Sequence, residues 1–372
     1  MGTPPTIDQH ADRSTRSPAP LAKNQIEISR ENELDVEAER RLYGIFRHFW
    51  HPVMYSAELT DRPARAVLCG QALVVARMAG QISVFNDLCA HRGAALSLGE
   101  VLPTGELQCA YHGWRYAGDG NCTLAPQRPD LAGQLRARVK KYAAVERYGM
   151  VWVCLEDEPY LPIPEFPQFD DPAYDKVFLP VSEWDCSPPR RTENYTDLSH
   201  FAFVHDGFLG DRTRPGVPEH RVWREDHVIR MLLDKPMAEP RDAAKNRSMA
   251  AADGQLDIIK NYHVFMPLTV LLDSANGDNH YCLFFHPTPI GPKRVRNFTI
   301  GARNYGSADT IHDEIVGWNE LVYGQDKPIV ESQRPEELPE DLSMEMYVRD
   351  VDTFSLTYRR FLLELIDRLD PR

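Results

Sequence analysis

The chain has 372 residues and a formal net charge of −13, from 42 Lys and Arg against 55 Asp and Glu. Its length suits two domains with a sizeable core. Its acidity argues against a nucleic-acid partner, because phosphate binding needs clustered basic side chains. No apolar run approaches about eighteen residues, so the sequence predicts no membrane span.

The beginning of the chain is poor in apolar residues. Residues 1–29 start with a stretch rich in Pro, Thr, Ser and Arg and hold no apolar segment of a secretory signal. We therefore expect a disordered tail and a cytoplasmic location. Residues 30–47 then show the charged pattern of a helix that leads into the first domain.

Residues 48–157 are predicted to form a small all-β domain. Short β runs at 66–68, 73–76, 82–85 and 150–155 are separated by turn signals such as Asp119-Gly120. Two short motifs stand among them, C-x-H and C-x-x-H, formed by Cys89, His91, Cys109 and His112. The remaining cysteines show no paired spacing and are expected as buried free thiols: Cys69, Cys122, Cys154, Cys186 and Cys282.

Two thiolates and two imidazoles are the ligand set of a Rieske [2Fe–2S] cluster, in which one iron binds both cysteines and the other binds both histidines. The same four residues could instead bind a structural zinc ion or be unrelated buried residues. A glycine closely follows each histidine, at Gly93 and Gly113. Backbone N–H groups must approach the cluster sulfurs there, which favours the cluster. Because the cluster carries one electron at a time, the motif predicts a redox protein.

A second candidate metal site follows a Pro-rich linker at 159–172, on a helix predicted at 194–209. This segment carries Asp197, His200 and His205 among aromatic residues. Two histidines and a carboxylate on one face of non-haem Fe(II) leave positions open for O2 and water. Five residues turn an ideal helix by about 140°, so we expect a π-type bulge or a helix break between the histidines. Two unconnected surface or capping histidines are the alternative.

The rest of the chain, residues 158–372, is predicted to form an α+β domain. We expect a β region at 219–302, a helix at 308–323 and a C-terminal helix with one apolar face: Phe354, Tyr358, Phe361, Leu362, Leu365, Ile366 and Leu369. The β region 258–290 should line a pocket, although half of its candidates must face away because strand residues alternate. These candidates are Tyr262, Phe265, Leu268, Leu271, Phe284 and Phe285.

Both motifs, their order and the domain sizes resemble the catalytic subunit of the Rieske non-haem iron oxygenases over roughly residues 45–370. The family pattern N-x-x-D-x-x-H-x-x-x-x-H is matched at Asn194, Asp197, His200 and His205. The resemblance implies that the two histidines bind the mononuclear iron and that Asn194 lies near it. It also implies a helix-grip, START-like catalytic domain around a central antiparallel sheet.

The resemblance further implies a third iron ligand, an aspartate from a helix near the C-terminus. The segment from Asp326 to Gln333 resembles the family stretch in which this aspartate precedes "xxxVExQ". We therefore choose Asp326, with Asp313 and Glu314 as alternatives.

The family also implies a route for electrons. Asp197 would bridge a cluster histidine of a neighbouring subunit, His112 or His91, to His200. The two centres would meet in this way across a head-to-tail homotrimer. The chain lacks a G-x-G-x-x-G fingerprint and a plant-type C-x₄-C-x₂-C run. Electrons from NAD(P)H must therefore arrive through a separate flavin reductase, a ferredoxin or both.

The subtype can also be inferred from the resemblance. Ala94 and Tyr111 stand where Rieske proteins of respiratory complexes carry two further cysteines, so the site is similar to the lower-potential cluster of oxygenases. The stretches 47–53 and 97–99 resemble the branch that acts on N-heterocycles, including purine-alkaloid N-demethylases.

We predict a monooxygenase that uses O2 and externally supplied electrons on a small nitrogen-containing or aromatic molecule. N-demethylation, N-oxygenation and hydroxylation are the reactions that fit. An aromatic-ring cis-dihydroxylating dioxygenase is the alternative. An electron carrier or a non-catalytic binding protein is a more distant one.

Overall fold

The computed structural model describes residues 36–236, 249, 257–306 and 308–371. The tail expected at 1–29 and the start of the leading helix lie outside the described residues. Within the described residues, the leading helix is α1 (Val36–Gly44), and a 3₁₀ turn at Ile45–His48 follows it. Shorter 3₁₀ turns occur at Ser56–Glu58, Leu96–Leu98, Pro129–Leu131 and Leu342–Met344.

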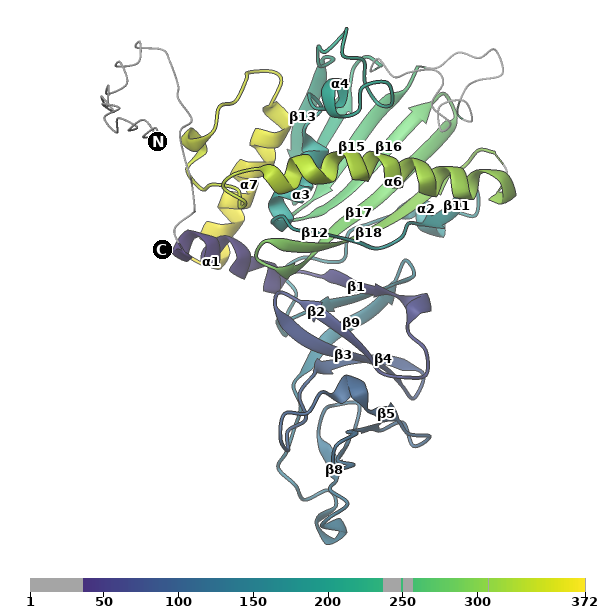
Figure 1. Cartoon of the computed structure of the whole chain (residues 1–372), viewed down its shortest axis with the longest axis vertical. Coiled ribbons are helices and arrows are strands. Elements are labelled where there is room, and N and C mark those ends of the chain that lie inside the picture. Colours follow the sequence, from purple (N-terminus) through teal and green to yellow (C-terminus); the bar gives the residue numbers. More distant parts are fainter. Residues whose placement is uncertain (1–35, 237–248, 250–256, 307, 372) are drawn as a thin grey trace, which may run out of the picture. The chain divides into compact units, whose positions relative to one another are not determined.

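An N-terminal β region contains two antiparallel sheets (Figure 1). The six-stranded sheet has the order β1-β10-β9-β4-β3-β2, with β1 (His51–Tyr55), β2 (Ala64–Leu68), β3 (Gln71–Met78), β4 (Gln81–Asn86), β9 (Lys141–Arg147) and β10 (Met150–Cys154). The four-stranded sheet runs in chain order, with β5 (Glu100–Val101), β6 (Leu107–Gln108), β7 (Arg115–Tyr116) and β8 (Cys122–Leu124). The β runs expected in this region therefore form.

Three hairpins of the six-stranded sheet share one kind of turn. Cys69-Gly70, Ala79-Gly80 and Tyr148-Gly149 each place two successive residues at positive φ. This is the type I′ conformation, whose twist matches that of the flanking strands. Glycine at the second position accepts positive φ without steric cost, so the sequence fixes these connections locally.

The C-terminal α/β region is built on an eight-stranded antiparallel sheet of order β11-β18-β17-β16-β15-β14-β13, with β12 paired to β18. Its strands are β11 (Asp175–Phe178), β12 (Ser182–Trp184), β13 (His220–Glu225), β14 (Val228–Leu233), β15 (Ile259–Phe265), β16 (Thr269–Asn276), β17 (Asn279–Gly291) and β18 (Arg294–Arg303). Its helices are α2 (Pro167–Asp170), α3 (Pro188–Thr196), α4 (Phe201–Val204), α6 (Ala308–Ser332) and α7 (Thr353–Leu369). The expected α+β fold with a central antiparallel sheet is confirmed.

The long helix α6 crosses the strands of this sheet (Figure 1). It was expected to end near residue 323 and instead continues to Ser332. The predicted apolar face of α7 is confirmed, because the side chains of this face are buried in the main core or, for Leu369, packed against it: Phe354, Tyr358, Phe361, Leu362, Leu365, Ile366 and Leu369. Within the described residues, no helix has the length and apolar character needed to cross a membrane.

The β region and the α/β region share buried side chains. Tyr55 and Trp152 from the six-stranded sheet pack in one cluster with Phe284 and Phe298 of β17 and β18. The Tyr55 hydroxyl lies 3.0 Å from the Leu179 and Thr299 carbonyl oxygens. The two regions therefore meet through a buried core that contains both apolar side chains and hydrogen bonds.

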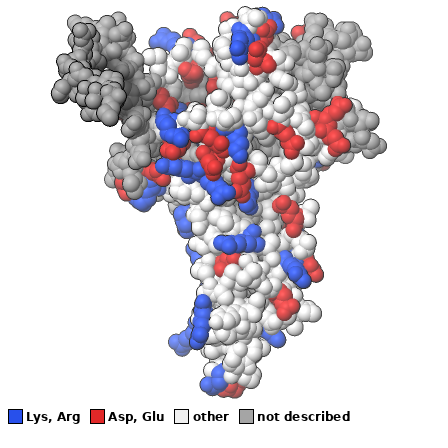
Figure 2. Space-filling view, viewed as in Figure 1, with Lys and Arg blue, Asp and Glu red and all other residues white. Residues whose placement is uncertain are grey.

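Charged side chains of both signs are interspersed on the face shown in Figure 2. Near the meeting of the regions, Glu183 accepts hydrogen bonds from Arg294 and Arg296, each with one contact of 2.6 Å. The cysteines outside the two motifs are free thiols, as expected, and all except the partly exposed Cys69 are buried.

Candidate metal centres

The first candidate centre is formed by two loops with the same backbone pattern. In the first loop, the Cys89 N–H donates to the Ala94 carbonyl at 2.8 Å, and the Gly93 N–H donates back to the Cys89 carbonyl at 2.8 Å. In the second, the Cys109 N–H donates to the Trp114 carbonyl at 2.8 Å, and the Gly113 N–H donates to the Cys109 carbonyl at 3.0 Å. Both glycines have positive φ, 68° and 69°, which explains why glycine follows each histidine.

The side chains of these loops converge. The rings of His91 and His112 lie 4.6 Å apart, and His91 stacks on Trp114 at 4.6 Å with an angle of 3°. The Tyr116 hydroxyl lies 3.0 Å from the Cys89 sulfur. Among the described residues, the buried Nδ1 atom of His91 has no hydrogen-bond partner. A metal-binding nitrogen is expected to lack one, so the donor set fits a [2Fe–2S] cluster.

The second candidate centre brings together the three residues chosen from the sequence. The Asp326 Oδ1 atom lies 3.0 Å from His205 Nε2 and 3.5 Å from His200 Nε2. One donor atom from each of the three residues lies within 4.8 Å of the others. The alternatives Asp313 and Glu314 are exposed and take no part. Two imidazoles and one carboxylate on one side of a shared point form the donor set of a non-haem iron site.

The continuous helix predicted at 194–209 is wrong, and no π-type bulge separates its histidines; the other expectation, a helix break, is confirmed, because α4 ends at Val204 before His205. Helix α3 ends at Thr196, and Asp197 is extended with φ −98° and ψ 119°. Helix α4 is a single turn that His200 and His205 flank, and His205 has left the helical conformation with φ −110° and ψ 32°. The histidines stand at the two ends of this turn: His200 keeps helical dihedral angles of φ −67° and ψ −22°, and the departure of His205 from them allows the two rings to converge.

Polar contacts surround the side chains of the triad. His205 Nδ1 lies 2.8 Å from the Gln325 Oε1 atom, which accepts its proton and leaves Nε2 free to bind a metal. His200 Nδ1 lies 3.4 Å from the Asp197 carboxylate. The Asn194 amide nitrogen donates to Asp326 Oδ1 at 3.3 Å.

Both carboxylates of this site are anionic. Burial by itself would raise the pKa of Asp326, but the hydrogen bond with His205 and the nearby histidines lower it below its ordinary value. Burial opposes ionisation of Asp197 as well, yet contacts with His200 and Ser199 lower the pKa of this carboxyl. Ser199 donates to it from its backbone at 2.7 Å and from its hydroxyl at 2.6 Å.

Helix α3 is anchored by buried ion pairs. Pro188 occupies its first turn, and the Ser187 hydroxyl caps its N-terminus by accepting from the Arg190 N–H. Arg359 on α7 pairs with Glu193 through two hydrogen bonds, one of 2.7 Å. Arg190 in turn donates to Glu345 at 2.6 Å.

A buried arginine supports the wall between α3 and the sheet. The Arg191 guanidinium lies 4.1 Å from the Trp184 ring centroid and 4.4 Å from that of Phe285, which are cation–π distances. Its Nη1 atom donates to the Asn194 side-chain oxygen at 2.5 Å. Arg191 therefore orients the amide that contacts Asp326.

A cavity opens directly beside the triad. Its lining joins the triad to side chains from α3, α4, the sheet and α6: Asn194, Tyr195, His200, Phe201, His205, Leu209, Lys260, Tyr262, Leu272, Ser274, Tyr281, Leu283, Trp318, Asn319, Val322, Tyr323 and Asp326.

Of the six pocket residues expected from the sequence, only Tyr262 lines this cavity. Three of the others, Phe265, Leu271 and Phe284, belong to the core shared with the β region. Leu268 and Phe285 lie in the main core. The sequence analysis missed Trp318, Asn319, Val322 and Tyr323 on α6. These residues precede Asp326 at intervals of three or four residues, so they lie on the same face of the helix as Asp326. This pattern could have predicted them as pocket residues.

Paired Cys and His loops in one region and a triad of two histidines and one carboxylate in the other define a class of protein, the oxygenases that combine a Rieske cluster with a non-haem iron. Comparisons with known proteins agree with that class. The family model described as the Rieske [2Fe-2S] domain matches residues 49–143. The vanillate O-demethylase oxygenase C-terminal domain matches residues 184–368.

Individual relatives extend over most of the chain. Methylxanthine N1-demethylase NdmA of Pseudomonas putida is 34 % identical over 331 residues, which cover 86 % of this chain and 89 % of NdmA. Methylxanthine N3-demethylase NdmB of the same organism is 33 % identical over 332 residues, with the same coverage. The structure of P. putida NdmA with caffeine has a TM-score of 0.77 at 33 % identity and covers 88 % of this chain and 93 % of that one.

Dicamba monooxygenase bound to dicamba, at 24 % identity and a TM-score of 0.73, shares the fold. The chain belongs to the Rieske non-haem iron oxygenases and is an oxidoreductase of that family.

Proposed function

We propose that this chain is a monooxygenase that removes a methyl group from a nitrogen atom of a small N-methylated heterocycle. The observation that carries the proposal is the cavity that opens onto His200, His205 and Asp326. Support comes from the identity with the methylxanthine demethylases and from the NdmA structures with caffeine and theobromine. N-oxygenation, hydroxylation and ring dihydroxylation are the competing outcomes of the test below.

In this proposal, Cys89, His91, Cys109 and His112 hold the cluster within residues 48–157. The mononuclear iron would be held within residues 158–372 by the triad of His200, His205 and Asp326. When bound, the cluster delivers single electrons and the iron activates O2.

The protein positions the substrate and excludes water from it. Leu272, Leu283 and Val322 give the cavity apolar walls, which favour a flat heterocycle over water. Gln325 fixes the ring of His205, and Asn194 holds the Asp326 carboxylate, so the metal-binding atoms are preorganised. A methyl group that points at the triad is then the part of the substrate that reacts.

The overall reaction consumes one O2 and one NAD(P)H for each methyl group removed. One oxygen atom enters the N-methyl group, which leaves as formaldehyde, and the other leaves as water. The two electrons come from NAD(P)H through a separate flavin reductase, a ferredoxin or both, and we propose a cytoplasmic location where these donors operate. Asp197 would pass electrons toward His200, with which it is already in contact at 3.4 Å.

We propose a head-to-tail homotrimer as the working assembly. Among the described residues, no hydrogen bond or ion pair joins the cluster loops to the triad within one chain. Exposed apolar side chains flank both sites: Leu88, Leu98 and Tyr111 at the loops, and Ile329 and Met346, which line one surface cavity together with Asp197. A head-to-tail contact, in which the loop patch of a second copy covers the patch near Asp197, would place the His112 of that copy beside Asp197, and repeating the contact closes a ring. Sedimentation of a fully active monomer would contradict this.

The test uses the purified protein with both metals restored and a surrogate reductase. Caffeine and theobromine are incubated with NADH and ¹⁸O2, and products are identified by mass spectrometry. We expect formaldehyde and the demethylated xanthine in equal amounts, and neither from the His205→Ala variant. A nitro product, or a ring product that gains ¹⁸O without formaldehyde, would overturn the proposal.

Iron analysis separates the enzyme from the other classes of protein. The oxygenase should contain about three irons per chain, two in the cluster and one mononuclear. An electron carrier would contain about two and a non-catalytic relative none. The Asp326→Ala variant should lose the mononuclear iron and keep the cluster.

A further inference from the structure

Arg191 on α3 is a buried cation close to the triad. Its exposed fraction is 0 %, whereas arginine is almost never fully buried unless an acid pairs with it. In the part of the chain that the structure describes, no carboxylate forms an ion pair with Arg191, and its Nε and Nη2 atoms have no hydrogen-bond partner. Its positive charge is therefore not neutralised by a direct neighbour.

Four aromatic rings surround the Arg191 guanidinium in place of an acid. Its central carbon lies 4.1 Å from the ring centroid of Trp184 and 4.4 Å from that of Phe285. The ring centroids of Tyr195 and Tyr323 follow at 4.9 Å and 5.1 Å. Aromatic faces attract a cation, but a ring carries no net charge. The rings therefore make burial of the guanidinium tolerable and leave its positive field in place.

A single amide group links this charge to the triad. Arg191 donates to the Asn194 side-chain oxygen at 2.5 Å, and the Asn194 amide nitrogen donates to Asp326 Oδ1 at 3.3 Å. A guanidinium has no acceptor, so the amide oxygen must face Arg191 and the amide nitrogen must face the carboxylate. The cation thus fixes the direction of the amide and lies only one side chain away from a metal-binding group.

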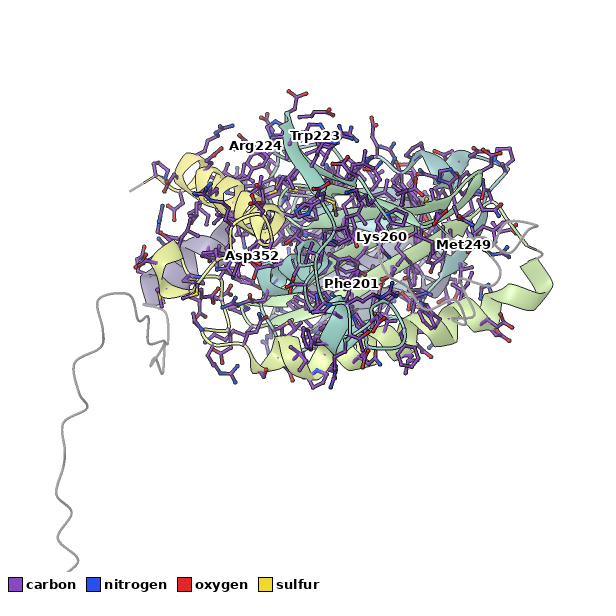
Figure 3. The ribbon with its side chains drawn as sticks, turned by 90° about the horizontal axis from the view of Figure 1, so that it is seen from above. Phe201, Trp223, Arg224, Met249, Lys260 and Asp352 are labelled. Atoms are coloured by element: carbon purple, nitrogen blue, oxygen red, sulfur yellow. The ribbon has the colours of Figure 1, made fainter. Side chains whose placement is uncertain are left out.

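The surroundings of the triad limit screening of this charge by water. Figure 3 shows that side chains fill the space between the sheet and α6, and it labels Phe201 among them. The Phe201 ring lies 4.7 Å from the His200 ring, and both His205 and Asp326 are buried. Charges act on each other more strongly in a protein interior than in water. The field of Arg191 should therefore reach the iron site.

We propose that Arg191 raises the reduction potential of the mononuclear iron and so keeps the resting site ferrous. Loss of an electron from ferrous iron adds a positive charge to the site, which a fixed cation nearby opposes. Oxygenases with this ligand set use Fe(II), and groups beyond the ligands tune a bound metal. Arg191 is thus a positioning residue, because it acts on the site through its field and through Asn194. The inference concerns the iron site and does not depend on which substrate is oxidised.

The test is a redox titration of the full, metal-loaded protein without O2 or substrate. Electron paramagnetic resonance follows the ferric mononuclear iron, and visible absorption follows the cluster. In Arg191→Met, the ferrous-to-ferric ratio at a fixed potential should fall at least tenfold, which lowers the midpoint potential by about 59 mV for one electron. The cluster midpoint in the same sample should move by less than a third of that shift.

Three control variants separate the charge from packing. Arg191→Lys changes the shape of the side chain but keeps its charge, and it should keep most of the iron midpoint. Trp184→Phe weakens the closest ring contact and leaves the charge, so the ferrous-to-ferric ratio should change less than about twofold. Arg221→Met removes an exposed charge that water screens, and it should have no effect.

An unchanged iron midpoint in Arg191→Met would overturn the inference. An equal shift in Trp184→Phe would do the same, because packing alone would then explain the result. Circular dichroism of the cluster checks folding, and iron analysis checks occupancy. If Arg191→Met loses the mononuclear iron, the neutral Arg191→Gln variant must show the tenfold fall, or the inference fails. Demethylation is not measured in this titration, so its absence would refute the proposed function alone.

Discussion

Replacing Arg359 with methionine should destabilise the protein by about 3 kcal/mol. Arg359 is 4 % exposed and forms two hydrogen bonds with Glu193 and a contact of 2.7 Å with Glu345. Removing one partner of a buried pair typically costs about 3–5 kcal/mol, because the other charge is left without compensation. Arg190 stays 3.5 Å from Glu193 and keeps part of that compensation, so we expect the lower end of this range.

Urea denaturation followed by fluorescence measures the change in unfolding free energy. The Arg221→Met variant is the control, since the Arg221–Asp234 pair is exposed and should contribute less than about 1 kcal/mol. In a double-mutant cycle with Glu193→Gln, the coupling energy should exceed about 1.5 kcal/mol. A loss no larger than that of the control, or a coupling near zero, would refute the argument.

The same variant has a local consequence at the iron site. Glu193 lies on α3, which also carries Asn194 and leads directly to Asp197. Loosening α3 should lower mononuclear iron occupancy while the visible spectrum of the cluster stays unchanged. Parallel loss of both metals would indicate general unfolding instead.

Three further predictions concern single side chains. Asp197→Ala should keep both metals and substrate binding but lose turnover driven by the reductase, because the carboxylate that contacts His200 is gone; iron analysis and product formation measure this. Burial raises the pKa of Glu337 from 4.5 to about 8, so stability should fall by about 1.4 kcal/mol per pH unit as pH rises between these values. Glu337→Gln should remove that slope in urea denaturation at pH 6 and pH 8. Tyr116→Phe should lower the cluster reduction potential by about 45 mV, since one hydrogen bond to Cys89 of about 1 kcal/mol is lost; redox titration measures it.

Each of these predictions has a result that contradicts it. Near-normal coupled activity of Asp197→Ala excludes the bridging role, and the exposed Asp206→Ala provides its control. A pH dependence of stability that is equal with and without Glu337 means that this carboxyl does not titrate as its burial requires. An unchanged potential in Tyr116→Phe means that the hydroxyl does not donate to the cluster sulfur.

The metal sites could be predicted because their chemistry is local in the sequence. Cys89 and Cys109 each begin a short loop that contains a glycine with positive φ. The hydrogen bonds of such loops join residues that are close in sequence. Asp326 lies far from the histidines in sequence and was found only through a family pattern. The structure explains its position, because α6 packs across the sheet and presents this carboxylate at α4.

The pocket was poorly predicted for a physical reason. Residues such as Leu271 and Phe284 look like pocket residues, but the face of a strand that is turned to the cavity depends on register, and neighbours in sequence face opposite sides. The other face of this sheet packs against the β region, a partner that apolar composition does not reveal. The end of α3 at Thr196 was equally inaccessible, because a residue distant in sequence holds it: the Ser355 hydroxyl of α7 donates to the Thr196 carbonyl oxygen at 3.0 Å.

The core shared by Tyr55, Trp152, Phe284 and Phe298 limits how this chain can be recombined with its relatives. A chimaera that exchanges only the cluster-bearing region must join two halves of one packed interior, which tolerates little change of volume. Electron-transfer properties should therefore be transferable between family members by exchanging the two loops alone, because the backbone hydrogen bonds of each loop join residues within a six-residue segment. Exchanges of the whole region should require matched substitutions on β17 and β18.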